Sequence, residues 1–238
     1  MDNYKCLKNH IIICGYGRNG KQAAINLQEH GERLVIIDQK EDLSTKYNDK
    51  NSFFIVGDAT ENDTLIKANI KNAKALITSL PVDADNLYVV LTARQINSSI
   101  KIVSRVSNIS SNSKLKKAGA NFVVMPDLIG GKHMAKLVAQ PDIVEFLDKI
   151  LLQSKGEVNL EEFSCCSLRK EFVDKSIGEL GIRNITGANI IGMKKGEGKF
   201  IFNPSHEEKL SQNDKIFVLG TNNQLEKLIN MLSNKGGE

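Results

Sequence analysis

The residues best suited to chemistry form a glycine-rich loop near the start of the chain. Gly15, Gly17 and Gly20 have the spacing G-x-G-x-x-G, between an apolar run at 11–14 and a helix-like segment at 21–30. In such a unit the first glycine allows a tight turn, the second lets the backbone approach a phosphate, and the third lets helix and strand pack closely. The helix N-terminus adds free N–H groups and the positive end of a dipole. We therefore predict a nucleotide-binding loop made of Gly15, Tyr16, Gly17, Arg18, Asn19 and Gly20.

Polar residues follow the later apolar runs, where ligands of open parallel sheets bind. Asp38 ends the second run and is placed to accept hydrogen bonds from ribose hydroxyls, or else to cap the segment from Lys40. Asp58 is suited to an adenine amino group or to capping the next turn, and Ser79 to ribose or to its own loop. Their neighbours Gln39 and Ala59 complete the expected site.

Two arginines are the candidates for phosphate contact. Arg18 lies inside the glycine loop, where a guanidinium can bind phosphate bidentately, although a solvent-exposed loop arginine is the alternative. Arg105 lies near the end of the fifth run and either adds charge to the phosphate region or pairs with an acid at an interface.

Catalytic groups are missing from this pattern. The histidines are His10, His30, His133 and His206, and none is placed as the acid or base that hydride transfer needs. No nucleophile–base pair or metal-ligand cluster stands out, and Cys165-Cys166 lacks the spacing of a C-x-x-C motif. We expect no catalytic residue, no metal site and no enzyme.

Composition favours an ordinary globular protein. The chain has 238 residues, 41% of them hydrophobic and 25% charged, and its net charge of +4 is too small to indicate nucleic-acid binding. Its apolar runs are too short to span a bilayer, and its polar start is unlike a signal peptide. We expect a cytoplasmic protein with free thiols.

The elements that must position the loop alternate as strand and helix, which predicts an α/β fold with a doubly wound, Rossmann-like parallel sheet. The expected strands are 11–14, 34–37, 53–56, 75–78, 101–106 and 122–125, and a capping box is expected at Thr60–Asp63. This domain covers 1–140. A helical crossover and linker at 141–156, with the linker at 153–156, precede a smaller α+β lobe at 157–238.

Helices are expected at 127–140 and from Pro141 to Leu152, and their apolar faces have nothing in the sheet to cover them. A neighbouring chain is the natural cover. In the lobe, strands at 188–193 and 199–202 flank a hairpin turn, a third strand lies at 215–219, and a helix spans 224–232.

The motifs resemble those of the RCK/KTN domains, the regulators of potassium conductance. The glycine loop, Gly57-Asp-Ala-Thr60, Lys117-Ala-Gly-Ala-Asn-Phe-Val-Val124 and Pro126 are similar to the N-terminal RCK domain. Asn203-Pro204 and Asn213–Gly220 are similar to the RCK C-terminal domain. The likeness covers nearly the whole chain in the correct order.

The resemblance implies a gating module at the inner face of the cell membrane, assembled as dimers in an octameric ring and bound to a K⁺ channel pore in cis. A free-standing regulatory subunit of a Trk/Ktr-type transporter is the alternative, and an NAD-dependent dehydrogenase a weaker one. The implied ligands are adenine nucleotides (ATP or ADP) or NAD(H), with Arg18 favouring ATP or ADP. In the C-terminal lobe, Arg183, Asn189 and Ile190 are candidate contacts for cyclic di-AMP. Ser79, Arg105 and Ser107 stand where calcium-gated relatives have carboxylates, so that calcium site is expected to be absent.

Overall fold

The computed structural model describes residues 7–46, 52–151 and 158–233. The chain divides into two compact units, Met1–Met134 and Ala135–Glu238, and each is described by itself. The linker expected at 153–156 lies outside the described residues.

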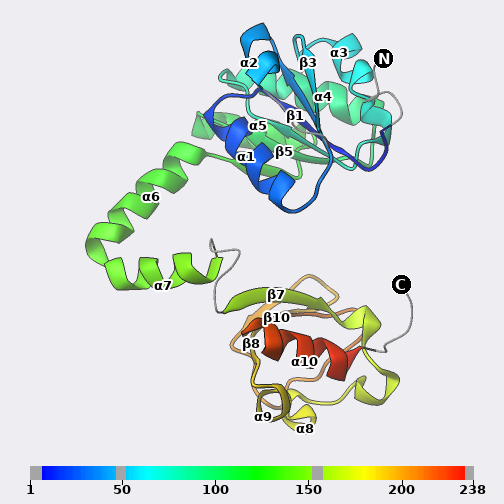
Figure 1. The fold of residues 1–238 in the computed structure, drawn as a ribbon, viewed down its shortest axis with the longest axis vertical. Coiled ribbons are helices and arrows are strands. Elements are labelled where there is room, and N and C mark those ends of the chain that lie inside the picture. The colour runs from blue at the N-terminus through cyan, green and yellow to red at the C-terminus, as the bar shows by residue number, and fades with distance from the viewer. Residues whose placement is uncertain (1–6, 47–51, 152–157, 234–238) are drawn as a thin grey trace. The chain divides into compact units, whose positions relative to one another are not determined.

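The first unit contains a parallel six-stranded sheet, as the sequence predicts (Figure 1). No strand end differs from its predicted position by more than one residue. The strand order is β3-β2-β1-β4-β5-β6, the arrangement of a doubly wound nucleotide fold. The strands are β1 (Ile11–Cys14), β2 (Leu34–Asp38), β3 (Ser52–Val56), β4 (Ala75–Thr78), β5 (Lys101–Arg105) and β6 (Phe122–Val124).

Two hydrophobic layers hold this sheet because strand side chains alternate between its faces. Ile11 and Ile13 pack on one side with Ala24 of α1, and Ile12 and Cys14 pack on the other. Cys14 is fully buried, and burial raises the pKa of its thiol, so it acts as a small core hydrophobe. The helices are α1 (Arg18–Glu29), α2 (Glu41–Lys46), α3 (Asn62–Lys67), α4 (Asp83–Ile96), α5 (Ile109–Lys117) and α6 (Pro126–Ala139), with a 3₁₀ turn, η2, at Ile70–Asn72.

The capping box expected at Thr60–Asp63 is wrong. The N-cap of α3 is Glu61, and no side chain caps the helix there. The Thr60 backbone N–H, which a capping box would direct to Asp63, instead donates to Asp58 Oδ1 at 2.8 Å, and the Thr60 hydroxyl donates to the same oxygen at 2.7 Å.

The segment that leads into β1 is fixed by long-range hydrogen bonds. The Asn69 side-chain amide donates to the Leu7 carbonyl at 2.8 Å, and the Arg33 guanidinium donates to the Lys8 carbonyl at 2.6 Å. The Asn9 N–H donates to the Asn72 carbonyl. His10 is fully buried with its Nε2 2.9 Å from the Ala68 carbonyl, while its Nδ1 has no partner among the described residues.

His10 gives the first unit a predicted pH dependence. Burial lowers the pKa of His10 below its ordinary value of 6.5; the bond to Ala68 opposes this shift and the charge of Arg33 adds to it. The unfolded chain therefore binds a proton that the folded chain excludes. Stability from this group is complete above about pH 6.5 and is lost as the pH falls toward the lower, folded-state pKa.

The test compares the free energy of unfolding of the wild type and His10→Gln at several pH values. Glutamine keeps an N–H donor for Ala68 but does not titrate. We expect the wild type to lose more stability than His10→Gln between about pH 6.5 and pH 5. Parallel pH profiles would contradict this role of His10.

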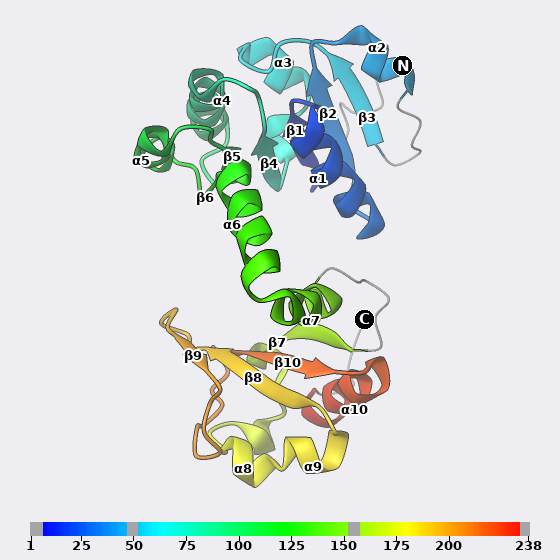
Figure 2. The same ribbon diagram turned by 90° about the vertical axis from the view of Figure 1, so that its left-hand side faces the viewer.

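The second unit contains an antiparallel four-stranded sheet of order β7-β10-β8-β9, with α8, α9 and α10 on one face (Figure 2). The predicted hairpin is confirmed by the pairing of β8 with β9. The elements are α7 (Pro141–Leu151), β7 (Asn159–Ser164), η3 (Cys165–Ser167), η4 (Lys170–Phe172), α8 (Ile177–Leu180), α9 (Ile182–Thr186), β8 (Asn189–Lys194), β9 (Phe200–Phe202), β10 (Lys215–Gly220) and α10 (Asn222–Leu232).

Helices α6 and α7 expose most of their apolar side chains. No residue of α6 is buried, and its Val138 is 88% exposed. In α7, Val144 is buried while Ile143, Phe146 and Leu147 are exposed. Several exposed large apolar side chains on one helix are typical of a protein interface. Among the described residues, no helix is both long and apolar enough to cross a membrane.

Candidate functional site

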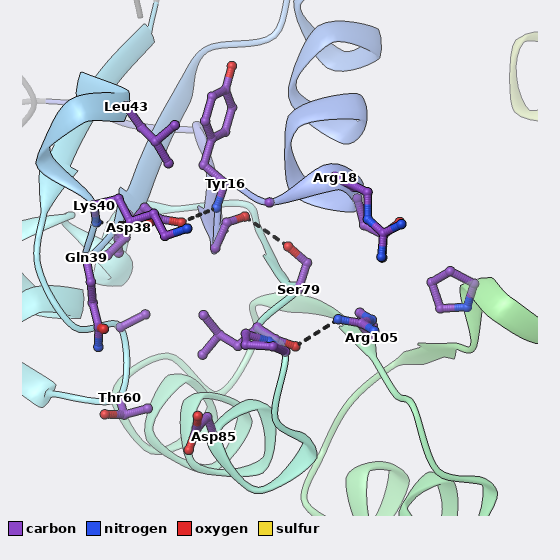
Figure 3. Close-up of a pocket in the computed structure, with 18 of the residues that line it drawn as sticks. Tyr16, Arg18, Asp38, Gln39, Lys40, Leu43, Thr60, Ser79, Asp85 and Arg105 are labelled. Atoms are coloured by element: carbon purple, nitrogen blue, oxygen red, sulfur yellow. Dashed lines mark hydrogen bonds between the residues drawn. The ribbon is translucent and has the colours of Figure 1, made fainter. Parts of the chain in front are cut away.

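A pocket lies at the carboxyl ends of the strands of the first unit (Figure 3). Its volume is about 1010 Å³, at the upper end of the range for small-molecule sites. Residues that follow β1 to β6 line it, so the sheet brings together side chains that are far apart in sequence. Eleven of the twelve predicted site residues line this pocket: Gly15, Tyr16, Gly17, Arg18, Asn19, Asp38, Gln39, Asp58, Ala59, Ser79 and Arg105.

Each glycine of the loop has a different geometric role. Gly15 has φ +90°, a backbone conformation that other residues rarely adopt. A Cβ on Gly17 would meet nothing within 4 Å, so the backbone at the start of α1 is open to a ligand. Gly20 does not line the pocket: a Cβ there would lie 1.9 Å from the Gly15 carbonyl oxygen. Gly20 therefore serves the packing of α1 against the loop.

Asp38 fixes the glycine loop in place. Its Oδ2 accepts a hydrogen bond from the Tyr16 backbone N–H at 2.6 Å, and its Oδ1 accepts one from the Lys40 N–H at 3.0 Å. The bond from Lys40 is the alternative role predicted for Asp38, in which its carboxylate caps the segment that begins at Lys40. Each carboxylate oxygen has a further lone pair, so Asp38 can still accept hydrogen bonds from a ribose.

Asp58 also supports the loops around the pocket. Its Oδ1 accepts hydrogen bonds from the Thr60 N–H and hydroxyl, and its Oδ2 accepts one from the Gln39 amide at 2.8 Å. The Thr60 bonds are the main cause that lowers the pKa of Asp58, so it is ionised at neutral pH. Asp58 thus links the ends of β2 and β3 and caps its own turn.

The Ser79 hydroxyl is engaged within the protein. Its single proton is donated to the Gly15 carbonyl oxygen at 2.9 Å, with the Cys14 carbonyl oxygen 3.3 Å away as the second acceptor within reach. Ser79 therefore fastens the end of β4 to the glycine loop, the structural alternative that the sequence left open.

Two guanidinium groups supply positive charge on the same side of the pocket (Figure 3). Arg18 is exposed and has no hydrogen-bond or ion-pair partner among the described residues. Arg105 donates to the Leu80 carbonyl over 3.4 Å, a long bond, while its buried Nε has no partner in the described part of the chain. No side chain caps the N-terminus of α1, at Gly17. An anion fits this arrangement because it would give these unsatisfied donors an acceptor.

The comparisons with known proteins agree with this geometry. Residues 11–126 match the family model of the TrkA-N domain, and residues 170–233 match that of the TrkA-C domain. Potassium channel protein 1 of Methanocaldococcus jannaschii is 40% identical over 230 residues, which are 96% of this chain and 68% of that protein. The chain belongs to the TrkA-type, or RCK, family. The resemblance that the sequence motifs indicate is thereby confirmed.

Two further relatives extend this result. A Trk system potassium uptake protein TrkA homolog of Methanothermobacter thermautotrophicus is 26% identical over 211 residues, 88% of this chain and 93% of that protein. The solved structure described as the GsuK channel bound to NAD has a TM-score of 0.51 and 26% identity, covering 94% of this chain. This RCK chain spans only 38% of that GsuK chain.

Sequence reasoning missed one wall of the pocket. Pro126, Asp127, Gly130, Gly131 and Met134 of α6 line it, and a Cβ on either glycine would meet nothing within 4 Å. The strand-end rule could have found Pro126 and Asp127, because they follow β6. Other lining residues that the sequence analysis did not assign to the site come from the loops and helices after the strands: Lys40, Asp42, Leu43, Thr60, Leu80, Pro81 and Asp85.

In the second unit, the candidate cyclic di-AMP contacts have unequal exposure. Arg183 in α9 and Asn189 at the start of β8 are exposed, whereas Ile190 belongs to the hydrophobic core. Within the described residues no group of three or more His, Cys, Asp or Glu side chains is placed to hold a metal ion.

Proposed function

We propose that this chain is a nucleotide-binding regulatory module that controls potassium flux without catalysing a reaction. The observation that carries the proposal is the pocket in which the glycine loop, Asp38 and the two unsatisfied arginines converge. Its family is one of potassium-transport components, and the related GsuK structure is described as bound to NAD. The ligand class is therefore a dinucleotide such as NAD(H) or an adenine nucleotide such as ATP or ADP.

Different residues of the pocket would bind different parts of the nucleotide. The α1 N-terminus, Arg18 and Arg105 would hold the phosphates, and Asp38 would accept hydrogen bonds from a ribose. Asp58 and Ser79 would keep the loops in the binding conformation through the bonds described above. The bound nucleotide would supply negative charge and a rigid contact between the strand ends and the first turns of α6.

Regulation follows if the ligand prefers one conformation of α6 to another. A ligand shifts a conformational equilibrium only by its difference in affinity for the two states. Pocket residues from α6, including Gly130 and Gly131, would make affinity depend on how this helix lies. A second copy of the chain bound to α6 would then move together with this helix when a nucleotide binds.

The partner we propose is a K⁺ channel pore, with dimers of this chain assembled into an octameric ring at the inner face of the membrane. The 40% identity to a channel protein, against 26% to a TrkA homolog, supports the channel over a free-standing transporter subunit. Cyclic di-AMP binding to the second unit stays a prediction without a supporting contact.

The test is nucleotide binding by wild type, Arg18→Ala and Asp38→Asn, measured by calorimetry and by thermal unfolding with ATP, ADP, NAD⁺, NADH and cyclic di-AMP. A charge-assisted hydrogen bond contributes about 1.5–3 kcal/mol, so each substitution should weaken binding roughly tenfold to a hundredfold. Asparagine retains an acceptor for the Tyr16 N–H, which limits damage to the loop.

Lys117→Ala is the matched control, because it removes one positive charge from α5, none of whose residues line the pocket. It should bind like the wild type. Equal affinity of wild type, Arg18→Ala and Asp38→Asn for every nucleotide would refute this site.

A further inference from the structure

The amino ends of the strands in the first unit carry a row of basic side chains. Arg33 directly precedes β2, Lys74 directly precedes β4, and Lys101 is the first residue of β5. Lys8 lies three residues before β1. Backbone bonds join these segments side by side, because Ile11 N–H donates to the Arg33 carbonyl and Lys101 N–H to the Lys74 carbonyl. The row therefore crosses the sheet from β2 to β5.

An exposed aromatic side chain continues the row at β6. Phe122 is 52% exposed, and the ammonium groups of Lys101 and Lys116 lie 5.4 and 5.7 Å from the centre of its ring. Lys71, in the 3₁₀ turn η2 before β4, is also exposed. An apolar ring framed by ammonium groups combines positive charge with a group that can enter an interface.

The opposite edge of the same sheet carries charges of both signs, with Arg18, Lys40 and Arg105 among its carboxylates. Carboxylates follow or lie just beyond the carboxyl ends of four strands: Asp38, Asp58, Asp83, Asp85 and Asp127. Described acids near the basic edge include Glu32, which pairs with Lys74 at 2.5 Å, and Glu29 at the end of α1.

Helix dipoles and local contacts involve several of these cations. Lysines in the last turn of α5 complement the negative end of that helix, and α1 and α4 also end shortly before β2 and β5. The Arg33 guanidinium donates to the Lys8 carbonyl, Lys74 pairs with Glu32, and Lys101 lies over the Phe122 ring. Arg33, Lys74 and Lys101 nevertheless remain exposed to solvent at one edge of the sheet.

We propose that the basic edge, defined by Lys8, Arg33, Lys71, Lys74, Lys101, Lys116 and Phe122, binds the anionic phospholipid headgroups of a membrane. A row of cations complements a negatively charged leaflet, and an exposed phenylalanine ring can enter the boundary between headgroups and acyl chains. The proposal rests on the proposed function only in supposing that a membrane lies nearby.

The experiment measures co-sedimentation with vesicles of phosphatidylcholine containing phosphatidylglycerol, and with vesicles of phosphatidylcholine alone. We expect binding to the anionic vesicles only, and loss of that binding at high salt. Each basic residue near an anionic surface contributes about fivefold in affinity, so Lys71→Gln/Lys101→Gln should weaken binding roughly thirtyfold. Neither lysine donates a side-chain hydrogen bond to a described residue, so the fold should survive, as thermal unfolding would verify.

The matched control is Lys199→Gln/Lys227→Gln, which removes two exposed charges from the second unit and should bind anionic vesicles like the wild type. Equal binding to neutral vesicles, or equal losses in both double variants, would overturn the proposal. So would tighter binding of a DNA duplex through the same lysines. If vesicle binding is absent while nucleotides still bind, only this proposal fails; if nucleotide binding alone is absent, only the proposed function fails.

Discussion

Gly20→Ala is expected to abolish nucleotide binding and to destabilise the first unit by about 3 kcal/mol. The new methyl group would lie 1.9 Å from the Gly15 carbonyl oxygen and 2.8 Å from Ser79 Oγ, and the first of these is a backbone atom that cannot turn aside. Helix α1 would have to move away from the loop, which would separate its N-terminal N–H groups from the phosphate position. Urea unfolding and nucleotide calorimetry measure the two effects.

Gly17→Ala is the matched control for this prediction. Its Cβ would meet nothing within 4 Å, and the φ of −73° suits alanine, so stability should change by less than about 0.5 kcal/mol. The methyl group would nevertheless stand where the ligand approaches, so binding should weaken. The interpretation of the loop would be wrong if Gly20→Ala bound and folded like the wild type.

Val138→Glu is expected to convert a dimer into a monomer while leaving each unit folded. The side chain is 88% exposed, and α6 buries none of its residues within the chain, so the substitution removes no internal packing. In the dimer that we propose, this surface is covered by a second copy, and a buried unpaired carboxylate there would cost several kcal/mol. Light scattering coupled to gel filtration measures the mass.

The control for the dimer is Ile66→Glu, which adds the same charge at another exposed aliphatic residue, in α3. It should leave the mass unchanged. A Val138→Glu variant with the mass of the wild-type dimer would place the interface elsewhere, and a wild type that is monomeric when dilute would remove the proposed dimer altogether.

The strands and the glycine loop were predictable because their signals are local. Apolar runs such as 11–14 specify buried parallel strands, and the spacing of Gly15, Gly17 and Gly20 reports a positive φ, an open backbone and a close approach of α1, in that order. The strand-end rule then placed Asp38, Ser79 and Arg105 on one pocket, although they are separated by many residues.

What the sequence could not predict depends on neighbours in space. Nothing in the run around Asp38 indicates that its carboxylate accepts the Tyr16 N–H, and nothing around Thr60 indicates that it bonds to Asp58 instead of capping α3. The α6 wall was missed because Gly130 and Gly131 carry no side-chain signal. The basic edge was missed because its residues are scattered along the chain, and only the strand order aligns them.

The position of β1 has a mechanical consequence. This strand lies between β2 and β4 and is parallel to both, so its hydrogen bonds run across the direction of the chain. A tension applied at Leu7 would load all those bonds together in shear, along with the bonds that Asn69 and Arg33 make to the preceding segment. Shear spreads a load over many bonds, whereas peeling breaks them one by one. A pull on Leu7 along the strand would therefore move the first unit as a rigid body instead of unravelling it.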